Sequence, residues 1–301
     1  MVNNMVTNFK CKSILHRIIT NSPLSVLVSA LYLLLVVASA IIIAPFIVDY
    51  STKINMGLSN LEPFSLSHGF LYVLGSDNLG RSLLAKIIYA SQTTLIISCS
   101  TVAISLIIGG VLGTLSGYHG GITSVLIMRL TDALMSFPLL LLSILLLYIL
   151  QAQNSTIIIV LAISRIPLLL RVTHAEVLKV RELLFISAAK TMNISNYNIL
   201  RKHVAPNIFP TLLTFSALEV SIVMLAESSL SFIGLGVQAP NLSWGMLVAQ
   251  GTQYLNTSWW LATLPGAMIV FTALSCNIIS THFRKVLDPK SNNLNSGASN
   301  A

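Results

Sequence analysis

Two short motifs in the chain contain residues that could perform nucleophilic chemistry. Ser187 and Lys190 have the S-x-x-K spacing, and Ser76-Asp77-Asn78 is an S-D-N triplet. Penicillin-recognising serine enzymes use both motifs, but here their order is reversed and no K-T-G follows. The chain also lacks the H-E-x-x-H zinc motif and the G-x-x-x-x-G-K-[ST] phosphate loop. We therefore predict that the chain is not an enzyme and has no catalytic residue, metal site or ATP site of its own.

Four ionisable residues lie within, or near the ends of, long apolar stretches. A charge in such a stretch is costly to bury, so each is a candidate for a functional role. Glu219 lies about 15 Å into its stretch at the rise of an α-helix, and Arg165 also lies inside one. We predict that these two residues pair across a helix bundle. Glu227 and Asp132 lie nearer the ends of their stretches, and we predict that they anchor helices rather than bind a substrate.

The composition indicates that membrane helices carry these residues. Of the 301 residues, 54% are hydrophobic and only 9% are charged, whereas soluble domains are about a quarter charged. The net charge of +8 favours the basic cytoplasmic loops of a membrane protein over a nucleic-acid interface, because aromatic residues are not interleaved with the basic ones. Cys11, Cys99 and Cys276 have no metal-binding or redox spacing.

Six stretches are long and apolar enough to cross a bilayer as helices, which takes about 20 residues each. The first follows basic residues, as a signal peptide would, but it is too long for a signal peptide's apolar core, so we predict an uncleaved span. Small residues in the second span, such as Gly109 and Gly113, fit either close helix packing or a polar translocation path. The predicted spans are 23–48, 91–117, 129–151, 155–174, 209–234 and 259–281.

The distribution of Lys and Arg predicts the orientation of the chain. With the N-terminus in the cytoplasm, the inside segments and span ends hold thirteen of these residues and the outside segments hold three. An amphipathic stretch from Ser82 to Tyr89 is expected to lie in the membrane interface. The predicted parts are a cytoplasmic tail 1–22, a first helix 23–48, an outside loop 49–90, a core bundle 91–281 and a cytoplasmic tail 282–301.

The inside loop 175–208 has a helical pattern of its own. Apolar residues recur at helical spacing up to Ala189, and Asn193-Ile-Ser195 interrupts the pattern. A second short helix is expected to end before Pro206, and His203 within it is predicted to be a surface contact rather than a ligand. Long loops tend to be functional, so one interpretation is a docking element for a soluble partner. The other is an ordinary connecting loop.

Several short stretches occur in the order and at the spacing found in the binding-protein-dependent permeases of ABC importers. Over about residues 68–290 the chain resembles the dipeptide/oligopeptide/nickel group of that family, in particular the dipeptide permease C type. The resemblance implies an all-α membrane protein, a type I importer bundle of about six transmembrane helices with cytoplasmic coupling helices. The stretches are Leu74-Gly-Ser-Asp-Asn-Leu-Gly-Arg81, Gly117-Tyr-His-Gly-Gly121, Met128-Arg-Leu-Thr-Asp132 with Phe137-Pro138, Leu230-Ser-Phe-Ile-Gly-Leu-Gly236, Ser243-Trp-Gly245, Trp259-Trp260 with Pro265-Gly266, and Leu287-Asp-Pro289.

The cytoplasmic coupling motif of that family begins Glu-Ala-Ala, has a Gly a few residues on and ends near a Pro. In this sequence Ala188, Ala189 and Pro206 match, whereas Ser187 replaces the Glu and Asn193 replaces the Gly. Asn is the residue that best tolerates a left-handed turn after Gly, so the helix break can persist. Loss of the Glu removes a charge that could pair with a basic residue.

The resemblance implies a multi-pass subunit of a bacterial inner membrane, with both termini in the cytoplasm, and a permease domain at 91–281. Its partners would be a second permease subunit, two ATP-binding subunits under the coupling loops, a periplasmic or extracellular solute-binding protein and membrane lipid. The ATP would be used by the partner subunits, and this chain would bind no cofactor and no nucleic acid. Di- or oligopeptides are the expected cargo. Nickel or another small solute, or a scaffold without a transport role, are the alternatives.

Overall fold

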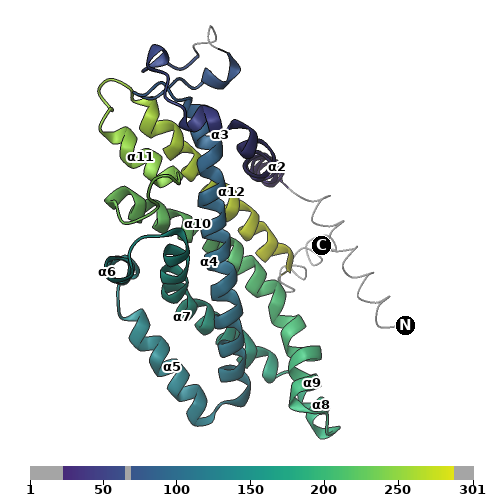
Figure 1. Cartoon of the computed structure of the whole chain (residues 1–301). Helices are drawn as coiled ribbons and strands as arrows, with labels where there is room; N and C mark the ends of the chain where they lie inside the picture. The colour runs from purple at the N-terminus through teal and green to yellow at the C-terminus, as the bar shows by residue number, and fades with distance from the viewer. Residues whose placement is uncertain (1–22, 65–68, 288–301) are drawn as a thin grey trace.

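The computed structural model describes residues 23–64 and 69–287 of the chain. The predicted tail 1–22 and residues 288–301 of the other tail lie outside the described residues. The described part is helical and contains no strand, apart from an isolated bridge between Ser76 and Ser82. Figure 1 shows an elongated helical bundle, with α11 and the segment between α3 and α4 at one end and α8 and α9 at the opposite end.

Five helices are long and apolar enough to cross a membrane, and a bent pair makes a sixth candidate. The first run consists of α2 (Leu24–Ala38), a π-helical turn (Ser39–Ile43) and α3 (Ala44–Thr52). The others are α4 (Leu83–His119), α7 (Asn154–Arg181), the continuous helix Asn196–Ile233, whose main part is α10 (Ala205–Ile233), and α12 (Trp260–Leu287). The expected all-α membrane bundle is therefore confirmed.

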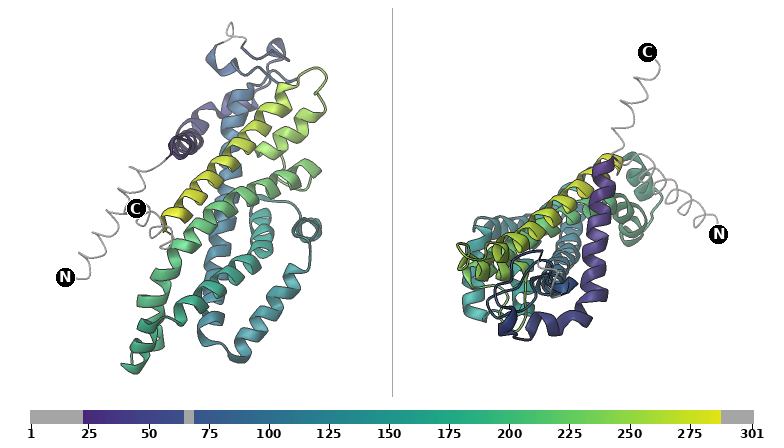
Figure 2. Two further views of the ribbon diagram at one scale, coloured as in Figure 1. Left: turned by 180° about the vertical axis from the view of Figure 1, so that it is seen from behind. Right: turned by 90° about the horizontal axis from the view of Figure 1, so that it is seen from above.

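The third predicted span, 129–151, is not one straight helix. It comprises most of α5 (Gly121–Met135) and all of α6 (Leu139–Leu150), which meet at a bend of 85°. Pro138 explains the break, because a proline disfavours helical backbone in the residue before it and donates no hydrogen bond. Figure 2 shows α5 and α6 at the side of the bundle.

Four other boundaries differ from the predicted ones. The Ser82 hydroxyl caps α4 by accepting from the Ala85 N–H, so residues 83–89 form the first turns of the long helix that was predicted to start at residue 91. The helix through Pro206 does not end there, since π-helical turn Leu200–Val204 leads directly into α10. Pro206, whose backbone has no N–H to donate, lies just after this π-helical turn. The helices α7 and α12 also extend beyond 174 and 281.

Close packing of α4 against α7 forms the centre of the bundle. Gly113 faces α7 so closely that a Cβ there would lie 2.6 Å from the Leu170 carbonyl oxygen. A Cβ added at Gly109 or Gly117, one helical turn away on either side, would lie 3.0 Å or less from backbone atoms of α7. The Ser105 hydroxyl, on the same face, donates to the Ala162 carbonyl at 3.2 Å. These small residues therefore serve close helix packing.

The C-terminal helices pack on the other side of α4. The helix α10 lies against α12 and α4, and α11 (Trp244–Thr252) packs on α12. Trp244 is fully buried, and its indole N–H donates to the Ile87 carbonyl at 3.0 Å. The helix α2 contacts α12, where the Tyr32 hydroxyl lies 3.1 Å from the Thr272 hydroxyl. Figure 2 shows α2 crossing α12 at a large angle when the bundle is seen from above.

Candidate functional site

The segment from α8 to the π-helical turn, residues 184–204, forms one tip of the molecule (Figure 1). The helix α8 (Leu184–Thr191) is amphipathic, and its Ile186 and Ala189 are buried against the ends of α7 and α10. Ser187 and Ala188 lie on the opposite, exposed face. The segment is therefore anchored to the bundle on one side and open on the other.

Asn193 breaks the helix as the sequence predicted. Its φ is +56°, in the left-handed region. The Asn193 N–H donates to the Lys190 carbonyl at 3.0 Å and the Ile194 N–H to the Ala189 carbonyl at 3.2 Å, which is the Schellman pattern of a helix end. The turn then leads into α9 (Asn196–Ile199). Asn193 thus takes the backbone role that glycine has in many such turns.

Tyr118, at the end of α4, fixes both arms of this segment. Its hydroxyl donates to the Asn196 side chain at 2.8 Å, and the Lys190 ammonium lies 5.5 Å from the centre of its ring. His203 is partly buried, with its ring 6.2 Å from that of Phe185 across the segment. Pro206 is exposed just beyond it. The two short helices are therefore held together as one unit.

The open face of this unit combines apolar and basic side chains. Leu184 is 88% exposed, Met192 75% and Tyr197 68%. Arg201 and Lys202 are also exposed. Large apolar side chains exposed within one short segment are typical of a protein interface, and the two cations of the same segment favour an acidic partner surface.

The structure brings Arg165 of α7 and Glu219 of α10 together inside the bundle, as the sequence analysis predicted. The Arg165 Nη1 atom lies 3.5 Å from Glu219 Oε2, and both side chains are buried. Among the described residues, neither carboxylate oxygen of Glu219 has a hydrogen-bond partner, and nor has Arg165 Nε. The pair is thus an electrostatic contact without hydrogen bonds.

The other two ionisable residues have different surroundings. Glu227 is fully buried, and its Oε1 accepts a hydrogen bond from the Ser231 hydroxyl at 2.7 Å. Ser231 also lies 3.3 Å from the Ser243 hydroxyl, so Glu227 belongs to a polar cluster that joins the end of α10 to the start of α11. Asp132 of α5 pairs with Arg171 of α7 on an exposed surface. Both residues link neighbouring elements.

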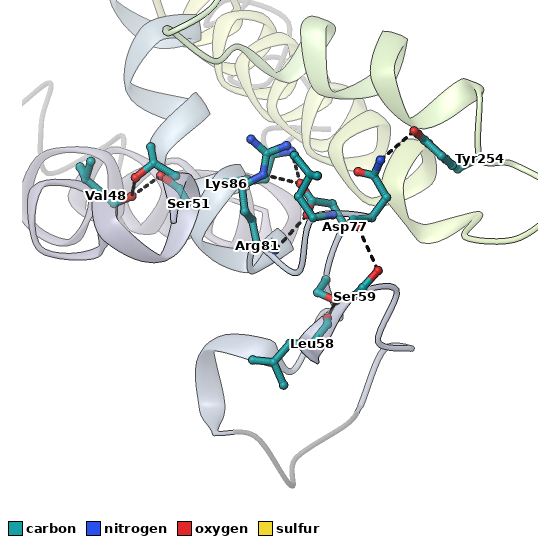
Figure 3. Close-up of polar contacts among 12 residues, drawn as sticks. Val48, Ser51, Leu58, Ser59, Asp77, Arg81, Lys86 and Tyr254 are labelled. Carbon is teal, nitrogen blue, oxygen red and sulfur yellow. Dashed lines mark hydrogen bonds and ion pairs between the residues drawn. The ribbon is translucent and has the colours of Figure 1, made fainter. Parts of the chain in front are cut away.

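A buried charge cluster at the opposite end of the molecule was not predicted. Asp77 accepts hydrogen bonds from Arg81 Nε at 2.7 Å and from Lys86 Nζ at 3.0 Å (Figure 3). It also accepts from the backbone N–H groups of Leu79 and Arg81. Burial alone would raise the pKa of Asp77, but the charge of Lys86 and these hydrogen bonds outweigh it and hold the pKa below its usual value.

The same segment is bound to the C-terminal helices. The Asn78 side chain donates a hydrogen bond to the Tyr254 hydroxyl at 2.9 Å. The Trp260 indole N–H donates to the Ser76 carbonyl at 3.4 Å. The composition of Gly75 to Arg81 is typical of tight turns. It does not indicate that the segment contacts the C-terminal helices.

The geometry also answers the question of nucleophilic chemistry. Ser187 lies in α8, and the Ser76-Asp77-Asn78 triplet lies at the other end of the bundle (Figure 1). The two motifs therefore cannot form one active site. Within residues 23–64 and 69–287, no three His, Cys, Asp or Glu side chains gather in a way that could hold a metal ion.

Comparisons with known proteins agree with this architecture. Residues 109–293 match the family described as the inner-membrane component of binding-protein-dependent transport systems. A putative peptide transport system permease of Brucella suis is 35% identical over 260 residues, 86% of each chain. A probable D,D-dipeptide transport system permease of Escherichia coli is 33% identical over 89% of this chain and 88% of its own length. A dipeptide transport system permease of Bacillus subtilis is 31% identical over 87% of this chain and 81% of its own length.

Proposed function

The chain belongs to the family of inner-membrane components of binding-protein-dependent transport systems, and on this premise we propose that it is a permease subunit of an importer for di- or oligopeptides. The observation that carries the peptide assignment is the agreement among relatives. Those from Brucella suis, Escherichia coli and Bacillus subtilis are all named as peptide or dipeptide permeases, and each matches most of the chain.

In this proposal, segment 184–204 is the surface on which an ATP-binding subunit docks. The exposed Leu184, Met192 and Tyr197 would enter a groove of the partner, and Arg201 and Lys202 would meet acidic residues around it. Ser187, Ala188, Ala189, Asn193, His203 and Pro206 would be the coupling residues. The buried face of α8 supports this role, because a docked helix must be fixed to the bundle to transmit a movement.

The remaining parts of the machine would come from other chains. A second permease subunit would complete the pathway, two ATP-binding subunits would supply the energy, and a solute-binding protein would deliver the peptide. The excess of Lys and Arg in the predicted inside segments favours placing α8 and α9 in the cytoplasm and the segment around Asp77 outside. Closure of the ATP-binding subunits would then switch the bundle between two conformations.

Two alternatives make different predictions. A permease for nickel or another small solute would use the same docking surface but a different binding protein. A scaffold without a transport role would need no ATP-binding partner, and the exposed apolar face of segment 184–204 argues against it.

The test is to express the chain with its partner subunits, purify the complex and reconstitute it in liposomes. We expect ATP-binding subunits to copurify, and dipeptides with the binding protein to stimulate ATP hydrolysis and enter the liposomes. Stimulation by Ni²⁺ alone would support the first alternative.

A pair of variants tests the docking surface itself. Leu184→Asp should abolish copurification of the ATP-binding subunits, because a charge would be buried at the interface. Phe70→Asp is the matched control, since Phe70 is also highly exposed but lies at the other end of the bundle. Retention of the ATP-binding subunits by Leu184→Asp would refute the assignment of this surface.

A further inference from the structure

The Arg165–Glu219 pair connects the two helices that hold segment 184–204. The helix α7 leads into this segment and α10 leads out of it, so the two helices are its only direct continuations in the chain. At the rise of an α-helix, Arg165 lies about 24 Å from the end of α7, and Glu219 lies about 21 Å from the start of α10. The pair is therefore deep in the bundle, far from the docking surface.

The pair also lies between two separate apolar clusters. One joins α7 residues 157–161 to α10 residues 223–230, and the other joins the end of α7 to the start of α10 and also includes α8 residues. Arg165 and Glu219 fall in the intervals between these clusters on their own helices. Pro167, two residues after Arg165, removes a backbone hydrogen bond from α7 at the same level. Between α7 and α10 the pair therefore separates two apolar clusters, while Leu169 and Leu170 of α7 pack against α4 at the same level.

The contact between the two charges is incomplete in this conformation. The nearest atoms are 3.5 Å apart, and among the described residues neither Glu219 oxygen accepts a hydrogen bond. A buried ion pair is favourable only when its geometry is good and its remaining polar atoms are bonded. A bidentate contact between the guanidinium and the carboxylate would supply the hydrogen bonds that the pair lacks here.

We propose that Arg165 and Glu219 are positioning residues that form a state-dependent latch between α7 and α10. The latch closes in one conformation of the transport cycle and is loosened in the conformation described above. It transmits movement of segment 184–204 to the apolar cluster that joins α7 residues 157–161 to α10 residues 223–230. This inference rests on the proposed function, since it assumes an ATP-driven partner at that segment.

The first test measures coupling in the complete transporter in liposomes. Arg165→Glu and Glu219→Arg should each lower the amount of peptide imported per ATP hydrolysed by about tenfold or more. In this proposal the pair does not contact the substrate, so the KM for the peptide should stay unchanged. The double exchange, Arg165→Glu with Glu219→Arg, should recover coupling to within about threefold of the wild type. The exposed ion pair Asp49–Lys53 gives the control, and Asp49→Asn with Lys53→Gln should behave as the wild type.

The second test is independent of the assembly of the single charge-reversal variants. The variant Arg165→Cys with Glu219→Cys is made in a background in which Cys11, Cys99 and Cys276 are changed to Ala. Its rate of disulfide formation should change by threefold or more when a non-hydrolysable ATP analogue binds the partner subunits. A threefold change corresponds to roughly 0.6–0.7 kcal/mol. Equal rates in both states would overturn the latch. An exchange variant as poorly coupled as the single variants would overturn it as well.

Two further results separate this inference from the proposed function. A raised KM with normal transport per ATP would assign the pair to the substrate pathway and refute the latch, while the permease function would stand. If the wild-type chain bound no ATP-binding subunit, the proposed function would fail first, and the latch would fall with it.

Discussion

The contact between α4 and α7 gives a prediction whose size follows from the structure. In Gly113→Ala, the new methyl group would lie 2.6 Å from the Leu170 carbonyl oxygen and 2.7 Å from Thr173 Cβ. An ordinary contact needs about 3.5 Å or more, so the two helices must separate locally by roughly 1 Å. A gap of that size forfeits a quarter to a half of the dispersion energy of the facing atoms. The expected cost is about 1–3 kcal/mol, as for other overpacked sites.

Gly110 offers a matched control in the same helix. A Cβ at Gly110 meets nothing within 4 Å, so Gly110→Ala adds the same methyl group without a clash. It should leave stability unchanged or raise it slightly, because Ala is the better helix former.

The assay is thermal unfolding of the detergent-solubilised protein, followed by the fraction that remains monodisperse after heating. At about 2–4 °C per kcal/mol, Gly113→Ala should lower the Tm by several degrees and Gly110→Ala should not. Equal Tm values for the two variants would refute the packing argument, because only the distance to α7 distinguishes them.

Three other changes have defined outcomes. Asp77 has a pKa below its usual value, so its ionised form stabilises the folded protein. That contribution should be complete above about pH 4, the pKa of an unfolded Asp, and should disappear as the pH falls through the lower folded pKa. In thermal unfolding, Asp77→Asn should therefore be less stable than the wild type at pH 7 and should lose less stability on acidification. Asn193→Val should cost about 1–2 kcal/mol because a β-branched residue is strained at φ +56°, whereas Asn193→Gly should be neutral, and limited proteolysis of segment 184–204 would report the difference. Trp244→Phe removes the hydrogen bond to the Ile87 carbonyl and should lower stability by about 1–3 kcal/mol in the same unfolding assay; an unchanged Tm would contradict the structural role of that bond.

Hydropathy predicted the long helices well but missed two of their details. The predicted span starts at residue 91, whereas α4 starts at Leu83 and contains Lys86. In the structure Lys86 is buried in the helix and neutralised by Asp77, a contact that no local pattern reveals. At the break between α5 and α6 the difference is reversed, because the helix is interrupted inside the predicted span. The apolar run continues across the break, while Pro138 interrupts the helix. A proline therefore outweighed hydropathy at one position, and an ion pair with a residue of the preceding turn outweighed it at the other.

The candidate site was predictable to different degrees. Arg165 and Glu219 could be paired from sequence because two opposite charges inside apolar helices have few other favourable arrangements. The break at Asn193 followed from its tolerance of left-handed backbone. The exposed face of α8 and the incomplete geometry of the ion pair depend on how α7, α8 and α10 pack, which spacing alone does not determine.

The bonds between the segment around Asp77 and the C-terminal helices have a consequence for the order of assembly during synthesis. Asn78 and Tyr254 are 176 residues apart in the chain, and Ser76 and Trp260 are 184 apart. At 5–20 residues per second, a ribosome would take about 10–40 s to make the second partner after the first. The hydrogen-bond and ion-pair partners of the Asp77 carboxylate, in contrast, lie within nine residues of it, in Leu79, Arg81 and Lys86. This charge cluster can therefore stabilise the turn around Asp77 before α11 and α12 have been synthesised.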